Sequence, residues 1–597
     1  MTSRPKTTTD VLIVGGGVSG LTASLLLSQA GVEHVLVERH DRTALLPKAH
    51  IINQRSMEIY RGLGVADEIY ALGAPAANMS HIAWMTSLTG PTALHGKVIG
   101  RVDAWSGGDE YAARSSCRAT NLPQLRLEPV LRRRAESSDR AKILFDHELT
   151  AFDQTSDGAH ATVLDRQRDQ NIEVEARYVI AADGGRFLGP ASGILMEGER
   201  DLLDMVSTHF SADLSSYWSD ESVVISFSTN PDGEGSLGSG VLLPMGPDAW
   251  GAKSPEWQYH SALHSGDPDQ FDDELMIQRM REMLGLPDFQ PLIHSISRWS
   301  FEGVLADRYS SGRVFFVGDS AHRHPPNGGL GLNTAVGDVH NLVWKLALVL
   351  RGGAGPELLD TYEQERHPVG AAVVDRALSN WRAHIGIDQA LGVSSAENSQ
   401  GGWAALEELF SDTEGGIKRR QDVDQAIAAA SREFVGQDVE LGYRYGGRAV
   451  LGEATDSGHD TTAVFDSTIR TGACVSHAWL QDRDTGTDVS TLDLAGGSHF
   501  TLFVGPDAVP QWTDAAAHAT RELALDARAL QVHSIGPAGS AARWIDASGA
   551  WNQAGGPTGS DAVLTRPDRH VAWLGRGVTD PAGQLMHALS AILSRDI

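Results

Sequence analysis

A glycine motif near the amino terminus restricts the possible folds more than any other stretch of the chain. Residues 10–14 (DVLIV) are apolar and mostly β-branched, which predicts a strand. The run GGGVSG follows at 15–20, then leucines at helical spacing up to Gly31, then a second β-like run at 34–37 that ends at Glu38. A G-x-G-x-x-G motif between a strand and a helix, with an acidic residue 18 positions after its last glycine, is typical of a βαβ unit that binds a dinucleotide.

Each glycine of the motif has its own predicted role. Gly15 would make the tight turn, Gly17 would let the backbone reach the pyrophosphate, and Gly20 would let the helix pack closely on the strand. Glu38 would accept hydrogen bonds from ribose hydroxyls. Residues 233–238 (GEGSLG) fit the same letters, but they lie between two β-like runs, so we interpret them as a hairpin or loop.

A second stretch, 313–348, predicts a strand, a rigid loop and a long helix. Residues 313–317 (RVFFV) form an apolar β-like run that ends in Gly-Asp at 318–319. Prolines and glycines at 322–331 are too frequent for regular structure, and helical spacing of apolar residues begins at Leu332. This layout is typical of a loop that holds a ligand against the N-terminus of a helix.

Two further motifs complete a set. Residues 178–185 (YVIAADGG) predict a strand that ends in Asp-Gly, and Leu122-Pro123-Gln124 begins an amphipathic helix. In their order along the chain, the glycine, Asp-Gly and Gly-Asp motifs resemble those of the class A flavoprotein monooxygenases, which are aromatic hydroxylases that bind FAD with one Rossmann domain. The resemblance covers about residues 10–374. A nicotinamide dehydrogenase would not need the two later motifs.

The carboxy-terminal third extends the resemblance to the phenol and 2,4-dichlorophenol hydroxylase branch. Residues 440–449 (ELGYRYGGRA) and 471–480 (TGACVSHAWL) resemble the corresponding segments of these enzymes. A βαβ…ββ layout, like that of their thioredoxin-like domain, is predicted by residues 500–504, a helix near 515–525, and residues 530–533 and 563–573. The region has no CxxC motif, so it cannot exchange thiols, and we expect it to be structural.

The resemblance implies an α/β fold with several parts. A Rossmann-type, glutathione-reductase-like FAD-binding domain would comprise 1–194, which includes part of the substrate pocket, and 301–395. A β-rich substrate domain would be inserted at 195–300. A helical linker at 396–435 and the thioredoxin-like domain at 436–597 would follow.

The resemblance also implies the cofactor contacts, residue by residue. They fall on Gly15, Gly17, Gly20, Glu38, Arg39, Lys48, Arg55, Gln124, Asp183, Asp319, Gly331, Leu332 and Asn333. Asp319 would bind a ribityl hydroxyl, Asp183 would belong to a motif linked to FAD and NAD(P)H, and Gln124 would contact the pyrophosphate. Lys48 and Arg55 would lie near the pyrophosphate and the entering pyridine nucleotide. The alternatives are turn carboxylates that bond their own backbone, for the two aspartates, and solvated surface charges, for the two basic residues.

The family's reaction sets the remaining expectations. NADPH or NADH reduces FAD, O2 adds at flavin C4a, and the hydroperoxide hydroxylates a phenolic ring, here with ortho attack expected. Backbone N–H groups of 331–333 would stabilise reduced flavin, and Pro326 would wall the pocket near C4a. His50 lies where the phenol-hydroxylase branch often has an acid or base, although a packed structural histidine is the alternative. Phe187 replaces the family's usual serine after Asp183-Gly-Gly-Arg, which weakens any prediction of pyridine-nucleotide contacts there.

Composition and local motifs argue against several other functional classes of protein. The 77 acidic and 49 basic residues give a net charge of −28, which argues against binding to nucleic acid or an anionic membrane. Only Cys117 and Cys474 occur, and no signal peptide or membrane-length apolar run is present, so we expect a cytoplasmic protein. We also expect a homodimer or larger homo-oligomer. His322 and His324 precede two prolines and lack a partner at ligand spacing, so no metal site is predicted. Ser320 does not fit the G-x-S-x-G nucleophile motif.

Three functions stay open at this point. The first is hydroxylation of a phenol, because the middle region lacks the basic cluster that a carboxylated substrate would require. The second is hydroxylation of a larger polycyclic or polyketide aromatic, for which the motifs would be identical. The third, from another class, is a redox-inert FAD-binding protein with a structural or regulatory role.

Overall fold

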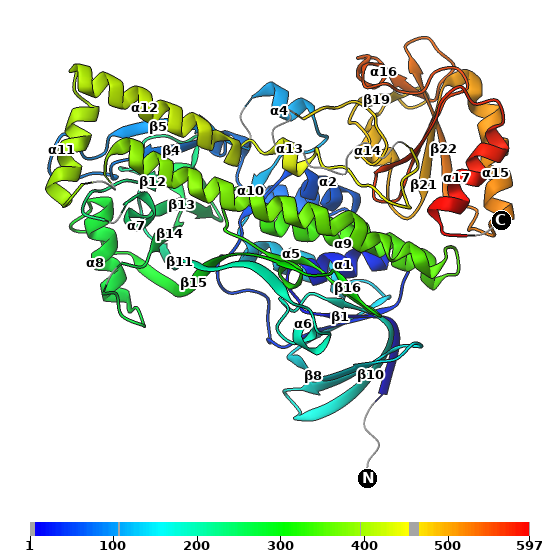
Figure 1. Cartoon of the computed structure of the whole chain (residues 1–597), viewed down its shortest axis with the longest axis horizontal. Helices are drawn as coiled ribbons and strands as arrows, with labels where there is room; N and C mark the ends of the chain where they lie inside the picture. Colours follow the sequence, from blue (N-terminus) through cyan, green and yellow to red (C-terminus); the bar gives the residue numbers. More distant parts are fainter. Residues whose placement is uncertain are drawn as a thin grey trace.

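The structure is a computed structural model that describes residues 6–105, 108–233, 235–264, 266–393, 396–452 and 465–595. Two long helices, α9 (Leu330–Leu350) and α10 (Thr361–Leu391), cross the middle of the molecule (Figure 1). The amino-terminal sheet lies below them in that view, a second sheet lies to the left, and the carboxy-terminal domain lies to the right.

The amino-terminal sheet is the predicted dinucleotide-binding unit. Neighbouring strands follow the order β16-β17-β10-β1-β2-β7, and all of them except β16 run parallel. The elements are β1 (Lys6–Val14), α1 (Val18–Gln29), β2 (His34–Glu38), α5 (Gln124–Glu136), β7 (Ala141–Phe145), β10 (Gln170–Ala181), β16 (Ser310–Ser311) and β17 (Val314–Phe316). The strands and helices predicted around the four motifs are therefore confirmed. β8 (His147–Gln154) and β9 (Ala159–Asp165) form an antiparallel hairpin beside β10.

The second sheet contains the β-rich middle region. Its order is β18-β15-β11-β14-β13-β12-β4-β5. The strands are β4 (His81–Met85), β5 (Val98–Asp103), β11 (Met196–Ser211), β12 (Val223–Ser228), β13 (Val241–Gly246), β14 (Glu256–Ala262), β15 (Leu292–Ala306) and β18 (His322–Arg323). β12 and β13 are antiparallel neighbours, so the second glycine-rich match lies in their connection, as interpreted.

This sheet differs from the sequence-based expectation in three respects. β4 and β5 join it from the amino-terminal part of the chain. The stretch 322–331, for which no regular structure is predicted, begins with the two-residue strand β18, because His322 pairs with Leu305 of β15. β14 and α8 (Asp273–Leu284) were not predicted; Met276 and Met280 of α8 pack with Trp257 against the face of the sheet.

Helix α9 is buried along almost its whole length and packs against α1. It begins at Leu330, two residues before the predicted start, because Gly329 adopts the left-handed conformation (φ 64°) and occupies the N-cap position. The apolar positions that predicted the helix, from Ala335 to Leu346, are in the core.

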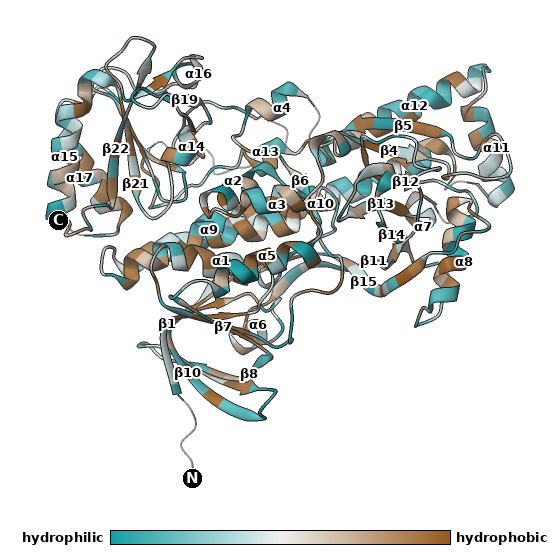
Figure 2. Ribbon diagram, turned by 180° about the vertical axis from the view of Figure 1, so that it is seen from behind, coloured by the Kyte–Doolittle hydropathy of each residue, from teal (hydrophilic) through white to brown (hydrophobic). Residues whose placement is uncertain are grey.

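The carboxy-terminal domain has the predicted βαβ…ββ layout. β21 (Phe500–Val504) and β22 (Leu530–Pro537) are parallel and joined by α15 (Val509–Glu522), and β24 (Ala562–Thr565) lies antiparallel to both β21 and β25 (Val571–Gly575). β21 is fully buried and predominantly apolar (Figure 2). Helices α11 (Ser399–Leu409) and α12 (Glu414–Ala430) precede this domain, and α12 packs on α10 and β5.

A buried charge network joins the carboxy-terminal domain to the central helices. Arg566 donates two hydrogen bonds to Glu365 of α10, the longer of them 2.9 Å, and also pairs with Asp568 at 2.6 Å. Lys345 of α9 donates to the same Glu365 at 2.8 Å and to Asn341 at 2.8 Å. Every member is fully or almost fully buried, so the two parts share one polar core.

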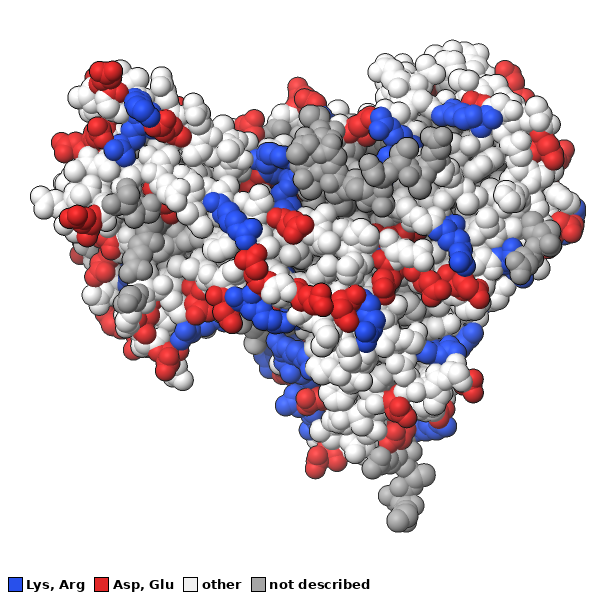
Figure 3. Space-filling view, viewed as in Figure 1, with Lys and Arg blue, Asp and Glu red and all other residues white. Residues whose placement is uncertain are grey.

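The face of the molecule shown in Figure 3 carries charges of both signs. On the side seen in Figure 3, Asp and Glu form a band across the middle that single basic side chains interrupt. Within the described ranges, no helix is both long and apolar enough to cross a bilayer.

Candidate active site

Three motifs that are far apart in the sequence meet at the carboxyl ends of β1, β10 and β17. A Cβ on Gly15 (φ 113°) would lie 2.1 Å from the carbonyl oxygen of Ala182, and one on Gly318 would lie 2.5 Å from Ser19 Oγ. Gly185 donates a hydrogen bond to Ser320 Oγ at 2.9 Å. A crevice outside the carboxyl ends of parallel strands is where such sheets bind nucleotides.

The glycines of the loop differ in their surroundings. A Cβ on Gly20 would lie 1.9 Å from the oxygen of Gly15, so only glycine permits this helix–strand contact. By contrast, a Cβ on Gly17 would meet only Glu128 Oε1, at 3.6 Å, which leaves its surroundings open. Helix α1 has no side-chain cap and no acidic residue in its first turn, so its N–H groups are available to a phosphate.

Glu38 and Gln124 make hydrogen bonds in and beside this loop. Glu38 accepts a hydrogen bond from the backbone N–H of Gly16 at 2.7 Å. Gln124 donates to Glu128 at 2.6 Å, and the other oxygen of Glu128 accepts from the N–H of Ala44 at 2.7 Å. Burial raises the pKa of Glu128. Glu128 was not predicted; its place one turn after Gln124 on α5 is the only sequence signal for it.

The predicted basic contacts occupy different environments. Lys48 is exposed, and its charge acts on buried Glu128. Arg39 is half-buried and bonds the ring of His40 at 3.2 Å. Arg55 lies on α2 (Gln54–Gly62), buried and paired with Glu58.

The two predicted aspartates differ in their bonding. Asp183 accepts four hydrogen bonds at 2.8–3.2 Å, from the amides of Gly185, Phe187 and Leu188 and from Ser320 Oγ. It therefore binds its own loop, which is the alternative that the sequence left open, and ties that loop to the Gly-Asp motif. Asp319 is exposed, and its carboxylate has no hydrogen-bond partner in the described part of the chain. An unengaged carboxylate at this place fits a ribityl hydroxyl.

A buried aspartate that was not predicted supports the Gly-Asp turn from behind. Asp338 of α9 accepts hydrogen bonds from Gly318 N at 3.0 Å, from His322 Nε2 at 2.9 Å and from Arg366 Nε at 2.8 Å. Burial alone would raise the pKa of Asp338, but Arg366 and His322 lower it, so the carboxylate is ionised. Its role could not be inferred from the sequence, because Asp338 lies between apolar residues of a predicted helix.

The N-terminus of α9 lies at the same crevice. It has no side-chain cap, and a Cβ on Gly331 would meet only the ring of His324, at 3.6 Å. Leu332 is buried in the first turn, and the Asn333 side chain binds the segment that precedes α2, accepting from Asn53 N at 3.0 Å. Pro326 is exposed, and its carbonyl accepts from Gly329 N at 2.9 Å.

Three histidines lie beside this loop, at the place where the substrate pocket is expected, which we call the cleft. His50, His260 and His324 lie so deep that burial lowers their pKa values to about 4, 3 and 4, yet each keeps part of its surface accessible. Gln258 Oε1 is buried and has no hydrogen-bond partner in the described structure, and His50 Nδ1 and Asn121 Oδ1 make no hydrogen bond of full geometry, although the Asn121 side chain interacts with His50. Unpaired buried polar atoms are rare in proteins and mark places where a ligand or water binds.

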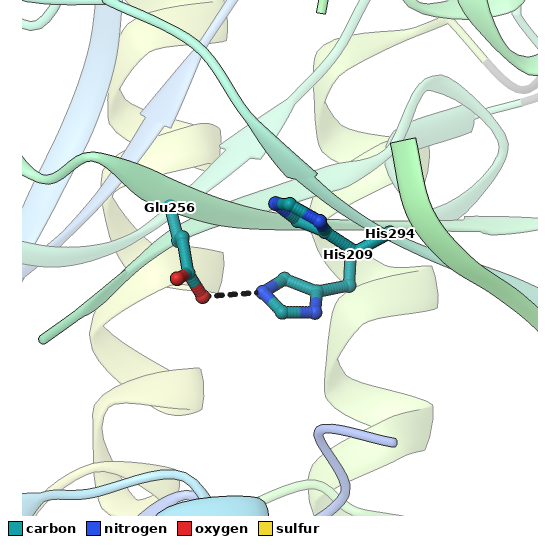
Figure 4. Close-up of side chains that lie close together, drawn as sticks. All are labelled: His209, Glu256 and His294. Atoms are coloured by element: carbon teal, nitrogen blue, oxygen red, sulfur yellow. Dashed lines mark hydrogen bonds and ion pairs between the residues drawn. The ribbon is translucent and has the colours of Figure 1, made fainter. Parts of the chain in front are cut away.

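One cluster in the described residues has metal-ligand composition, although no metal was predicted. His209, Glu256 and His294 lie within ligand distance of one another (Figure 4), with 2.7 Å between His209 Nε2 and Glu256 Oε2. The same oxygen of Glu256 binds Arg126 of α5 at 2.5 Å. The guanidinium already neutralises this carboxylate and would repel a cation, so the cluster is better explained as an ion pair that joins α5 to the sheet.

Known proteins match this chain over nearly its whole length. Residues 8–377 match the family described as FAD binding domain, and residues 468–595 match the one described as aromatic-ring hydroxylase, C-terminal. The chain is 34% identical to 2,4-dichlorophenol 6-monooxygenase of Delftia acidovorans, over 98% of each chain. It is 35% identical to tetracenomycin A2 monooxygenase-dioxygenase of Streptomyces glaucescens, over 98% of this chain and 97% of the relative. The solved structure of the flavin-dependent monooxygenase PieE in complex with FAD and substrate is similar with a TM-score of 0.90 and 36% identity, over 99% of this chain and all of PieE.

Proposed function

The chain belongs to the FAD-dependent aromatic-ring hydroxylases, and from this premise we propose that it hydroxylates a phenolic ring next to an existing hydroxyl group, with NADPH or NADH as reductant. The observation that carries the proposal is a group of buried polar atoms without full hydrogen bonding, on His50, Asn121 and Gln258, beside the loops where the three motifs meet. A phenol needs an apolar site with a few polar groups, and this cleft has such groups.

The residues present fit FAD. The open N-termini of α1 and α9 would receive the pyrophosphate and the negative edge of the flavin, and Asp319 would accept from the ribityl chain. Asp183 and Asp338 would hold the loops that make these contacts. Bound FAD supplies the transfer of electrons from NAD(P)H and the activation of O2 in this family.

His50 would bind the substrate hydroxyl. Because burial lowers its pKa to about 4, the imidazole is neutral at physiological pH, and its unpaired Nδ1 is available to accept a proton. Moving the phenolic proton toward His50 would make the ring more electron-rich at the ortho carbon, where hydroxylation occurs. Pro326 would shield that side of the cleft from water.

A larger polycyclic aromatic is the second candidate substrate. Asn121 Oδ1 and Gln258 Oε1 are unpaired acceptors in addition to His50, so the cleft fits a molecule with more than one hydroxyl donor. A relative named for a tetracenomycin is as similar as the dichlorophenol enzyme, at 35% against 34% identity.

The test is oxidation of NADH and NADPH by the purified flavoprotein with phenol, with 2,4-dichlorophenol, with the dihydroxyanthraquinone alizarin, and without an aromatic. We expect one class of aromatic to stimulate oxidation and to be recovered with one added oxygen. Absence of bound flavin, or no stimulation by any of these aromatics, would contradict the proposal.

Replacing His50 tests its role. We expect His50→Ala to lower the rate of hydroxylation by roughly 100-fold while the flavin content is retained, because His50 acts on the substrate proton. His294→Ala removes an exposed histidine outside the cleft and serves as the control. Unchanged turnover of His50→Ala at every pH would remove the histidine from the mechanism.

A further inference from the structure

Strand β14 turns a row of polar side chains toward the FAD-binding part of the molecule. Alternate residues of a strand share one face, which places Glu256, Gln258 and His260 together. Glu256 pairs with Arg126 of α5, and Gln258 Nε2 donates to the carbonyl of Pro47 at 2.8 Å, three residues before His50. The opposite face, with Trp257 and Tyr259, packs on α8. His260 is the next residue in the polar row, on the side where His50 lies.

His260 is held by a hydrogen-bonded chain that runs across the sheet. Ser207 of β11, its direct cross-strand partner, lies with Oγ 2.6 Å from His260 Nδ1. Trp299 of β15 donates its indole N–H to the same Oγ at 2.7 Å. An indole N–H can only donate, so Ser207 accepts from Trp299 and has its own proton left for His260 Nδ1.

These two hydrogen bonds determine which nitrogen of His260 carries the proton. With Nδ1 accepting from Ser207, a neutral imidazole has its hydrogen on Nε2. Burial, and in the same direction the neighbouring His50, lower the pKa of His260 to about 3, so the ring is neutral at physiological pH. Nε2 has no hydrogen-bond partner in the described structure and is not among the buried, unpaired atoms, so it is accessible to a ligand.

We propose that the Nε2–H of His260 donates a hydrogen bond to the phenolic oxygen of the substrate and stabilises its ionised form, with Ser207 and Trp299 as positioning residues. The inference rests on the proposed function. When the phenol ionises, its O–H bond breaks, the proton leaves to solvent by way of His50 Nδ1, and the negative charge on oxygen is met by the His260 N–H. His260 keeps its proton throughout, so the two histidines have different tasks.

The test measures the ionisation of a bound phenol directly. The probes are 4-nitrophenol and alizarin, whose ionised forms absorb at longer wavelength, titrated with the holoenzyme in the absence of NAD(P)H. We expect the wild-type protein to lower the apparent pKa of the bound probe, and His260→Leu to raise it again by about one unit, which is a tenfold loss of ionised ligand. His260→Gln retains an N–H donor and should keep most of the effect. Flavin content and thermal midpoint confirm that each variant is folded.

A matched pair of serines separates this role from general packing. Ser207→Ala breaks the bond that orients His260, whereas Ser211→Ala breaks an equivalent 2.7 Å bond from the same strand to His294, outside the cleft. We expect a shift of the probe's pKa with the first variant and none with the second. Equal shifts from both serine variants, or no shift with His260→Leu, would overturn the inference. In that event, aromatic-stimulated NAD(P)H oxidation by the wild-type protein would still support the proposed function, and its absence would refute the function itself.

Discussion

At the residue scale, Gly17 and Gly20 are three positions apart and differ in what an added methyl group would meet. At Gly20 it would collide with backbone, 1.9 Å from the oxygen of Gly15, whereas at Gly17 the nearest atom is 3.6 Å away. Gly17 also has φ of −79°, which any residue adopts. We therefore expect Gly20 to be needed for packing of the helix on the strand and Gly17 for the approach of the ligand.

Alanine at each position should separate these two roles. We expect Gly20→Ala to destabilise the flavin-free protein by about 1–3 kcal/mol, because the helix must move away from the strand. Gly17→Ala should leave the flavin-free protein close to wild type and weaken FAD binding by about tenfold or more, because the methyl group occupies the approach of the pyrophosphate. Thermal unfolding and flavin titration of the apoprotein measure the two effects. A Gly17→Ala variant with normal FAD affinity would contradict the assignment.

At the element scale, α9 connects the parts of the site. Its N-terminus opens into the crevice, Asp338 on its third turn holds the Gly-Asp motif, and Lys345 on its fifth reaches the carboxy-terminal domain's network. The helix was predictable from its apolar spacing. The roles of the polar residues within it were not, because the sequence does not show whether an aspartate is buried or which residues of other elements bond to it.

Two aspartates at this motif offer a matched test. Asp338→Asn would leave the buried guanidinium of Arg366 without a counter-charge, and we expect a loss of about 3–5 kcal/mol in unfolding free energy together with weaker FAD binding. Asp319→Asn removes an exposed, unpartnered carboxylate, so it should weaken FAD binding and change stability by less than about 0.5 kcal/mol. Denaturant unfolding and flavin titration of both variants decide this. Equal losses of stability would show that Asp338 is not the anchor of the turn.

Strands were predictable where their residues are apolar in runs, as at 10–14 and 500–504, because both faces are covered. β14 was not predicted, although Glu256, Gln258 and His260 alternate with aromatics as in a half-buried strand. These polar residues face the FAD-binding part of the protein. Two of these polar residues, Gln258 and His260, belong to the proposed substrate site. Local patterns therefore indicated the glycine, Asp-Gly and Gly-Asp loops, each of which is encoded by one stretch of sequence. They did not indicate the group of His50, Gln258 and His260, which comes from different elements.

At the scale of the whole molecule, the carboxy-terminal domain is fixed by a buried network rather than by an apolar face alone. Arg566 and Asp568 were predictable only as part of a strand pair, whereas in the structure they meet Glu365 and Lys345 of the central helices. Buried ion pairs of this kind add little net stability, but breaking one is costly, so they favour a single docking geometry.

Buried histidines distributed over the molecule give it an acid-sensitive stability. Burial lowers the pKa values of six of them to about 3–4, from an unfolded value of 6.5: His50, His260, His324, His340, His477 and His533. Below pH 6.5 the unfolded chain takes up protons that the folded protein does not. Stability is therefore full above that pH and is lost as the pH falls toward about 4, by up to about 1.4 kcal/mol per pH unit for each such group. Glu440, whose pKa burial raises to about 7, acts in the opposite direction, as do Glu128 and His384 with their raised pKa values, but these groups are fewer.

We therefore expect the urea midpoint of the protein to fall between about pH 7 and about pH 5, with a net uptake of several protons on unfolding. His533→Gln provides the internal control, because His533 lies in the carboxy-terminal domain, far in sequence from the cleft residues, and accepts a hydrogen bond from Trp544 at 3.1 Å. The variant should take up one proton fewer on unfolding, and its stability should depend less steeply on pH by the corresponding amount. A urea midpoint that does not change between these pH values would show that the imidazoles are hydrated in the folded protein. In that case His50 and His260 would also be charged in mildly acidic solution, and the proton assignment within the cleft would hold only above pH 6.5.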